Sequence, residues 1–188
     1  PAVAALLDGA PLQQHDALRD RLLVDDHFDL ERLYRPGERK HGTSMASLIL
    51  HGDQSGGQSE PLNRKLYCIP VMQPDSNSQA RNEHMPDDVF FEDRIHLAVR
   101  RMLVGLGQDV PPQAPDVKVI NLSIGDLERP FIHTPSPWAR LLDWLSYEYR
   151  VLFCVSSGNQ QDHIDIGMPH ATFNVLTNDQ KTQVTLSA

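Results

Sequence analysis

The sequence predicts an α/β fold in which a central parallel β-sheet carries helices on both faces. Short apolar runs recur along the chain, and segments with helical periodicity lie between them. Continuous apolar runs are typical of the inner strands of parallel sheets, which are buried on both faces. Strands that alternate with helices in this way favour a three-layer arrangement.

Four apolar runs are the predicted central strands. They lie in residues 2–7, 66–72, 119–125 and 151–156. Asp8 directly follows the first run, and ligands of open α/β sheets bind beyond the carboxyl ends of the strands, so Asp8 lies where chemistry is expected. A further strand is expected at the apolar stretch 173–177, followed by a fraying tail.

Two segments have the apolar residues of helices packed on a sheet, and they are residues 90–107 and 137–149. A third helix is expected at 44–51, after the histidine motif described below. Residues 15–33 scatter apolar positions among many charges, which predicts a short surface helix and a loop or edge strand. Two polar stretches, 52–64 and 73–89, are predicted surface insertions, and the second could shape a substrate cleft.

Composition limits the class of protein. With 188 residues, 40% hydrophobic and 22% charged, the chain suits one domain with a sizeable core. Lys and Arg number 17 against 25 Asp and Glu, and this net charge of −8 argues against a nucleic-acid partner. No apolar run approaches the length of a membrane span, so no membrane partner is expected.

Cysteine usage and the chain start bear on location. Cys68 and Cys154 each lie in an apolar run, so we expect buried free thiols, which mildly favour a cytoplasmic protein. The chain begins at Pro1 with no signal-peptide pattern, and we interpret it as a piece of a longer protein. Its location is otherwise undetermined.

One motif places a histidine at a helix start. His41 is followed by Gly42, which lets the backbone come close to whatever docks beside the imidazole. Thr43 or Ser44 can then cap the following helix. A second motif, Ser-Gly-Asn at 157–159, follows the apolar run at 151–156 and brings a carboxamide to a strand end.

Taken in order, Asp8, His41-Gly42-Thr43 and Ser157-Gly158-Asn159 resemble the blocks of the subtilisin-like serine proteases, or subtilases. The resemblance implies a subtilisin-like fold and hydrolysis of peptide bonds in polypeptide substrates by an Asp-His-Ser triad. Asp8 would be the carboxylate, His41 the base and Asn159 the oxyanion-hole donor. Each residue alone has an ordinary explanation as a cap, a helix-start histidine or a turn, so the order carries the assignment.

Two further segments resemble the backbone strands that flank the primary specificity pocket of that family. They comprise Ser123, Ile124 and Gly125, and Ser156, Ser157 and Gly158. Small residues there would let a peptide strand approach and pair with the backbone. Where the family usually has alanines in the second segment, this chain has serines, which implies a more polar pocket wall.

The nucleophile block is missing. In the family it reads Gly-Thr-Ser-Met-Ala, then a small residue and Pro, after the asparagine, and nothing between Asn159 and Ala188 matches. The same letters occur at 42–46, but Leu48 replaces the proline and Ser44 would lie three residues from His41, so Ser44 is disfavoured. We therefore expect a partial catalytic domain, with the serine beyond Ala188 and no turnover by this chain alone.

Cofactors and competing functions complete the expectations. The expected reaction requires no cofactor. Many subtilases bind calcium, however, and an acidic group could hold this ion here; the group consists of Asp25, Asp26, Asp29 and Glu31. A solvated acidic surface is favoured, and zinc is disfavoured because no His-Glu-x-x-His or paired cysteines occur.

A catalytically dead, peptide-binding subtilase fold is the alternative function. A nucleotide-binding domain is a third, disfavoured interpretation, because the chain has no Gly-x-Gly-x-x-Gly motif after its first strand. The oligomeric state stays open.

Overall fold

The computed structural model describes residues 1–53, 60–124, 135–156 and 166–187. The chain divides into two compact units, Pro1–Gly158 and Asn159–Ala188, and each is described by itself. Within the described ranges, no helix combines the length and the apolar character needed to cross a bilayer.

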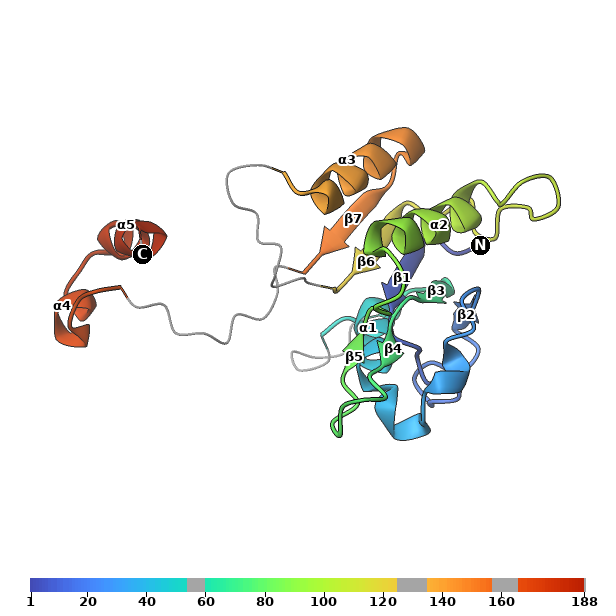
Figure 1. Ribbon diagram of the computed structural model, residues 1–188, viewed down its shortest axis with the longest axis horizontal. Helices are drawn as coiled ribbons and strands as arrows, with labels where there is room; N and C mark the ends of the chain where they lie inside the picture. Colours follow the sequence, from blue (N-terminus) through green and yellow to red (C-terminus); the bar gives the residue numbers. More distant parts are fainter. Residues whose placement is uncertain (54–59, 125–134, 157–165, 188) are drawn as a thin grey trace. The chain divides into compact units, whose positions relative to one another are not determined.

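The first unit is built on a five-stranded parallel sheet, as the sequence predicts (Figure 1). Its strands are β1 (Ala4–Asp8), β2 (Leu22–Val24), β3 (Leu66–Pro70), β6 (Val119–Leu122) and β7 (Leu152–Val155). Their spatial order is β2-β3-β1-β6-β7, with β1 in the centre. Leu6 of β1 is in register with Cys68 on one side and Asn121 on the other.

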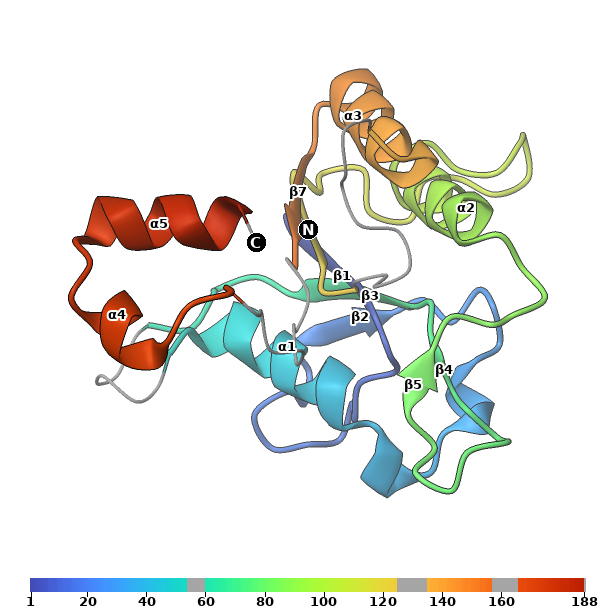
Figure 2. The same cartoon turned by 60° about the vertical axis from the view of Figure 1, so that its left-hand side comes forward.

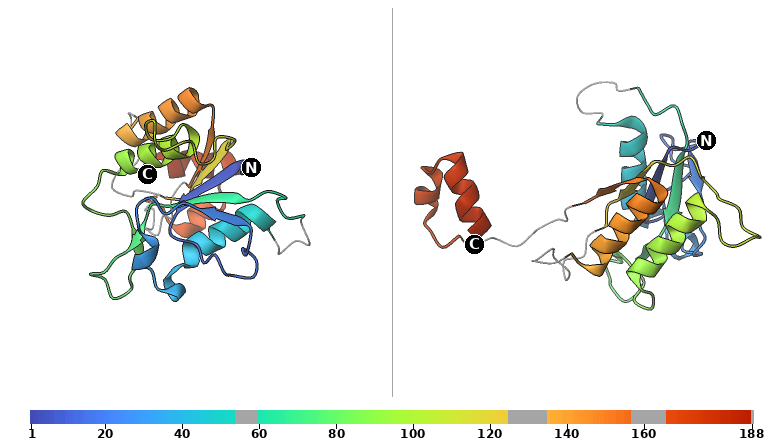
Figure 3. Two further views of the ribbon diagram at one scale, coloured as in Figure 1. Left: turned by 90° about the vertical axis from the view of Figure 1, so that its right-hand side faces the viewer. Right: turned by 90° about the horizontal axis from the view of Figure 1, so that it is seen from above.

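Helices cover both faces of this sheet, which confirms the three-layer prediction. Helix α1 (Lys40–His51) lies on one face, and α2 (Phe91–Leu103) and α3 (Pro137–Tyr149) lie side by side on the other (Figures 2 and 3). The apolar pattern of the sequence therefore located α2 and α3, and the histidine motif located α1.

Two hydrophobic cores lie on opposite faces of the sheet, and β1 contributes to both. Leu6 packs with Ala46 and Leu50 of α1. Leu7, the next residue, packs in the core that holds the buried side chains of α2 and α3. Successive strand residues point to opposite faces, so an inner strand must be apolar throughout, and this explains the unbroken run at residues 2–7.

Helix ends follow local sequence signals. The Ser136 side chain accepts a hydrogen bond from the Ala139 amide at 3.2 Å, and Pro137 occupies the first turn of α3. Helix α1 ends where Gly52 takes a φ of 69°.

The start of α1 differs from the prediction. The helix begins at Lys40 rather than Ser44, so neither Thr43 nor Ser44 caps it. The Thr43 hydroxyl instead lies inside the first turn, where it donates to the Arg39 carbonyl and accepts from the Leu12 amide at 2.8 Å. A tertiary contact with the loop after β1 thus replaces the expected cap.

Residues 15–33 contain no α-helix. They form turns, the short edge strand β2 and the 3₁₀ helix Glu31–Leu33, which a second 3₁₀ helix, Pro36–Glu38, follows. The predicted edge strand is confirmed and the predicted helix is wrong. In the turns at residues 15–21, Leu18 alone is fully buried, so these residues lack the continuous apolar face that stabilises a helix.

The second unit overturns the strand predicted at 173–177. It consists of α4 (His170–Asn174) and α5 (Asn178–Ser187). Thr177 and Gln180 form a capping box: the Gln180 side chain accepts from the Thr177 amide at 3.0 Å, and the Thr177 hydroxyl accepts from the Gln180 amide at 3.3 Å. The Thr-x-x-Gln pattern is a helix-start signal, and it outweighed the short apolar stretch.

The polar segment 73–89 contains a small antiparallel pair, β4 (Gln73–Pro74) and β5 (Glu83–His84). Both cysteines are free, and Cys68 is buried as expected. Cys154 is exposed, contrary to the prediction, because β7 is the edge strand of the sheet in the described residues.

Candidate active site

Several of the predicted site residues that the structure describes lie at or just beyond the carboxyl ends of the strands. Asp8 is the last residue of the central strand β1, and its side chain is fully buried. Ser123 directly follows the neighbouring strand β6, and Ser156 directly follows β7. Parallel strands bring such positions to one edge.

Asp8 and His41 are in direct contact. Asp8 Oδ1 lies 2.7 Å from His41 Nδ1, and it also accepts the Gly9 amide at 2.6 Å. The His41 side chain is 47% exposed, whereas Asp8 has no exposed side-chain surface. A ring that donates through Nδ1 carries its lone pair on Nε2, so the pair presents a basic nitrogen from a fixed ring.

The absence of a side chain at Gly42 allows this contact. A Cβ on Gly42 would lie 2.2 Å from the Gly9 carbonyl oxygen, so α1 can approach the turn after β1 only with glycine at this position. The bond from the Leu12 amide to Thr43 holds the same loop against the helix. Because His41 directly precedes Gly42 in α1, the contact between α1 and this loop sets the distance between His41 and Asp8.

The electrostatics follow from this contact. The hydrogen bond to Asp8 raises the pKa of His41 above its ordinary value, and partial burial only partly opposes the rise. The Asp8 carboxylate therefore favours the imidazolium form that a general base reaches after it takes a proton.

A residue that the sequence did not reveal completes the site. Glu83 of β5 lies against Gly9, since a Cβ there would meet Glu83 Oε1 at 1.7 Å. One ligand atom from each of Asp8, His41 and Glu83 lies within 4.8 Å of the others. Burial raises the pKa of Glu83 and the charge of Asp8 adds to the rise, while a hydrogen bond from Tyr34 and the charge of His41 oppose it. Glu83 lies in the polar insertion 73–89, where no local pattern sets it apart.

Comparison with known families bears on this site. The family model described as "Subtilase family" matches residues 14–179. The chain belongs to the subtilase family. Neither the comparison with curated proteins nor that with solved structures gives a match.

The family match includes His41 and Asn159 but begins after Asp8. The assignment of Asp8 to the candidate site therefore rests on the order of the blocks and on its 2.7 Å contact with His41. The contact is independent of the match, because it comes from the packing of α1 against the end of β1.

The two segments that the sequence predicts to bind substrate are described in part. Ser123 donates to the Asn121 side chain at 2.9 Å, Ile124 packs against the core, and the Ser156 amide donates to the Leu122 carbonyl at 3.3 Å. The remaining predicted positions, which include the oxyanion donor, lie outside the described residues; they are Gly125, Ser157, Gly158 and Asn159.

The four carboxylates of the acidic group contact separate partners. Asp25 binds Arg101 at 2.7 and 3.0 Å, and Asp26 accepts the amides of Leu30 and Glu31. Asp29 pairs with Arg32 and Glu31 with Arg39. Calcium needs six to eight converging oxygens, and these carboxylates are committed to separate partners, so the donor set does not fit the ion.

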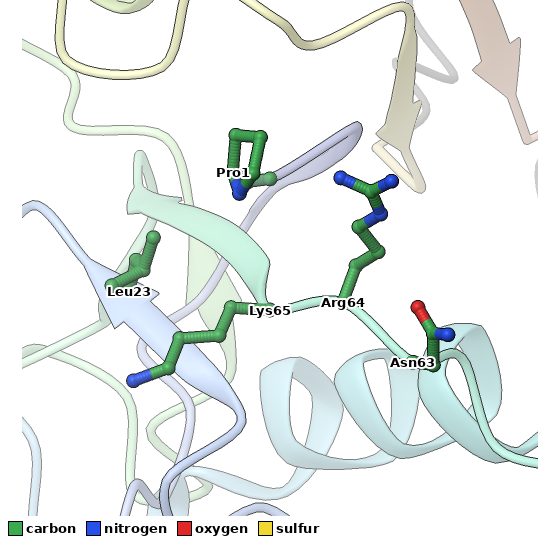
Figure 4. A pocket seen from close by; sticks show the side chains of 6 residues that line it. Pro1, Leu23, Asn63, Arg64 and Lys65 are labelled. Carbon is green, nitrogen blue, oxygen red and sulfur yellow. The ribbon is translucent and has the colours of Figure 1, made fainter.

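A cavity of about 390 Å³ lies at the other edge of the sheet (Figure 4). Its lining comes from residues that precede β1 and β3 and from β2; these are Pro1, Ala2, Leu23, Asn63, Arg64 and Lys65. The side chains of Arg64 and Lys65 point away from each other, so their charges do not converge on one ligand. This cavity is remote from the Asp8–His41 pair.

Proposed function

We propose that this chain supplies the carboxylate, the base and the oxyanion donor of a subtilisin-type serine endopeptidase. Asp8 holds the His41 ring, His41 takes the proton of the nucleophile, and Asn159 donates to the developing oxyanion. The contact of 2.7 Å between Asp8 Oδ1 and His41 Nδ1 carries the proposal, because it is the base-to-orienting-group bond that such a triad needs.

The nucleophile of the proposed enzyme is a serine that follows Ala188 in the parent protein. No Gly-Thr-Ser block follows Asn159 among the 188 residues. The peptide substrate would lie between residues 123–125 and residues 156–158 and pair with their backbone as an added strand. The proposal is supported by Ser123 and Ser156, which directly follow β6 and β7, since Asp8 ends the parallel strand β1 of the same sheet.

The test compares the parent protein with this chain. We expect the parent to hydrolyse a peptide substrate and to lose roughly 10⁴-fold or more in kcat on His41→Ala. Asn159→Ala should cost about 10²–10³ in kcat, as loss of the corresponding donor does in subtilisin itself. The 188-residue chain should give no burst with an activated ester. A burst that disappears on His41→Ala would contradict the proposed position of the nucleophile.

A fluorophosphonate probe separates this proposal from the disfavoured Ser44 nucleophile. Ser44 is exposed on α1, one turn after His41. Labelling should map to a serine outside the 188 residues. Labelling of Ser44 in the folded chain would instead move the nucleophile into the histidine block.

The missing serine block also favours a second candidate, a subtilase-fold module that binds peptides without cutting them. This module would bind extended peptides through the same two backbone segments. The candidate gains if the parent protein binds peptide at the site, does not hydrolyse it, and holds another residue at the serine position.

A further inference from the structure

Two carboxylates of this site each have an oxygen without a polar partner. Asp8 Oδ2 and Glu83 Oε1 are both buried and accept no hydrogen bond from the described residues. Asp8 is 1% exposed overall. A buried carboxylate oxygen without a partner costs free energy, and two nearby carboxylates also repel each other.

A cation between the two carboxylates would relieve both costs at once. One ligand atom each from Asp8, Glu83 and the half-exposed His41 ring already lies within 4.8 Å of the others. Ligand atoms on one tetrahedral zinc lie roughly 3.3 Å apart. Rotation of the His41 ring and adjustment of the partly buried Glu83 side chain would bring the three ligand atoms to this spacing.

We propose that Asp8, His41 and Glu83 form a binding site for a divalent transition metal, with Zn²⁺ as the ion of best fit. An imidazole nitrogen with two carboxylate oxygens suits zinc, whereas calcium prefers six to eight oxygens. The absence of a His-Glu-x-x-His motif does not bear on this site, because its three ligands come from β1, α1 and β5.

The metal changes the tautomer of His41. Nδ1 now donates to Asp8 Oδ1, so binding of an ion through Nδ1 moves the ring proton to Nε2. An Nε2 that carries a proton cannot accept one from a serine. Zinc at this site would therefore inhibit hydrolysis reversibly. This consequence rests on the proposed peptidase function, while the binding itself does not.

Calorimetric titration of the 188-residue chain with Zn²⁺ tests the binding. We expect one site, weakened at least tenfold by Glu83→Gln and by His41→Gln. The control substitutions Glu148→Gln, on the exposed face of α3, and His15→Gln, in an exposed turn, should leave the affinity unchanged. Ca²⁺ should not compete at equal concentration.

Two results would overturn the site: no zinc binding, or binding that neither Glu83→Gln nor His41→Gln weakens. If Glu83→Gln does not fold, the visible absorption of Co²⁺ in the wild-type chain and its loss in His41→Gln decide the matter, because the His41 ring is half exposed. In the parent protein, zinc should inhibit the wild type at a lower concentration than is needed to inhibit the Glu83→Gln variant. Zinc binding without any peptidase activity would retain the site and reject the proposed function.

Discussion

At the scale of single residues, the two members of the Asp8–His41 pair differ sharply in exposure. The Asp8 side chain has no exposed surface, and nearly half of the His41 side chain is accessible. The buried carboxylate is fixed by the end of β1 and by the Gly9 amide. The half-exposed ring gains its orientation from its contact with Asp8.

The Asp8–His41 pair should be visible in a titration of the histidine ring. His41 should titrate above its ordinary pKa of about 6.5, and Asp8→Asn should lower its midpoint, because the hydrogen bond from Nδ1 to Asp8 favours the charged ring. The raised folded-state pKa means that the pair stabilises the fold fully below pH 6.5. The stabilisation is lost as the pH rises through the folded-state value.

NMR measurement of the imidazole proton shifts against pH makes this test. An unchanged His41 midpoint in Asp8→Asn would mean that the carboxylate does not govern the ring.

At the scale of elements, the decisive contact is that of helix α1 with the turn after β1. Gly42→Ala would place a methyl group 2.2 Å from the Gly9 carbonyl oxygen and 2.9 Å from its carbon. Backbone atoms cannot rotate away, so we expect a net loss of about 1–3 kcal/mol in the free energy of unfolding. The loss should occur although alanine is the better helix former.

Urea unfolding measures this effect, and Gly37→Ala is its matched control. A Cβ on Gly37 meets nothing within 4 Å, so that substitution should change the free energy by less than about 1 kcal/mol. Equal effects of the two substitutions would show that close packing at Gly42 does not set the position of α1.

The elements also show what the sequence could predict. Apolar runs and helical patterns located β1, β3, β6, β7 and the helices α2 and α3, because burial on the sheet dictates those patterns, and the histidine motif located α1. The helix expected in residues 15–33 and the strand at 173–177 failed, because scattered apolar residues do not identify an element without its packing partner. Glu83 was missed for a similar reason: only the folding of β5 against Gly9 brings it to the site.

At the scale of the whole first unit, one sheet joins two hydrophobic cores. Leu7 belongs to the core under α2 and α3, and Cys68 belongs to the core under α1. Neither core encloses its side chains without the sheet, and β1 and β3 contribute to both. We therefore expect the two cores to unfold together in one transition.

Two probes report the two cores separately. Trp138 is buried in α3, so tryptophan fluorescence follows the core under α2 and α3. Burial raises the pKa of the Cys68 thiol and keeps it from reagents, so pulsed thiol labelling follows the core under α1. The labelling is done in a Cys154→Ser background, because Cys154 is exposed.

Leu7→Ala should lower the free energy of unfolding by about 2–5 kcal/mol, since it removes a fully buried side chain at the centre of the sheet. Both probes should shift to lower urea concentration by the same amount, although Leu7 belongs to only one of the cores. Leu48→Ala, on the exposed face of α1, should shift neither. A fluorescence transition that moves while Cys68 labelling stays in place would mean that the cores unfold independently, and the Asp8–His41 contact would then depend on α1 and its own core alone.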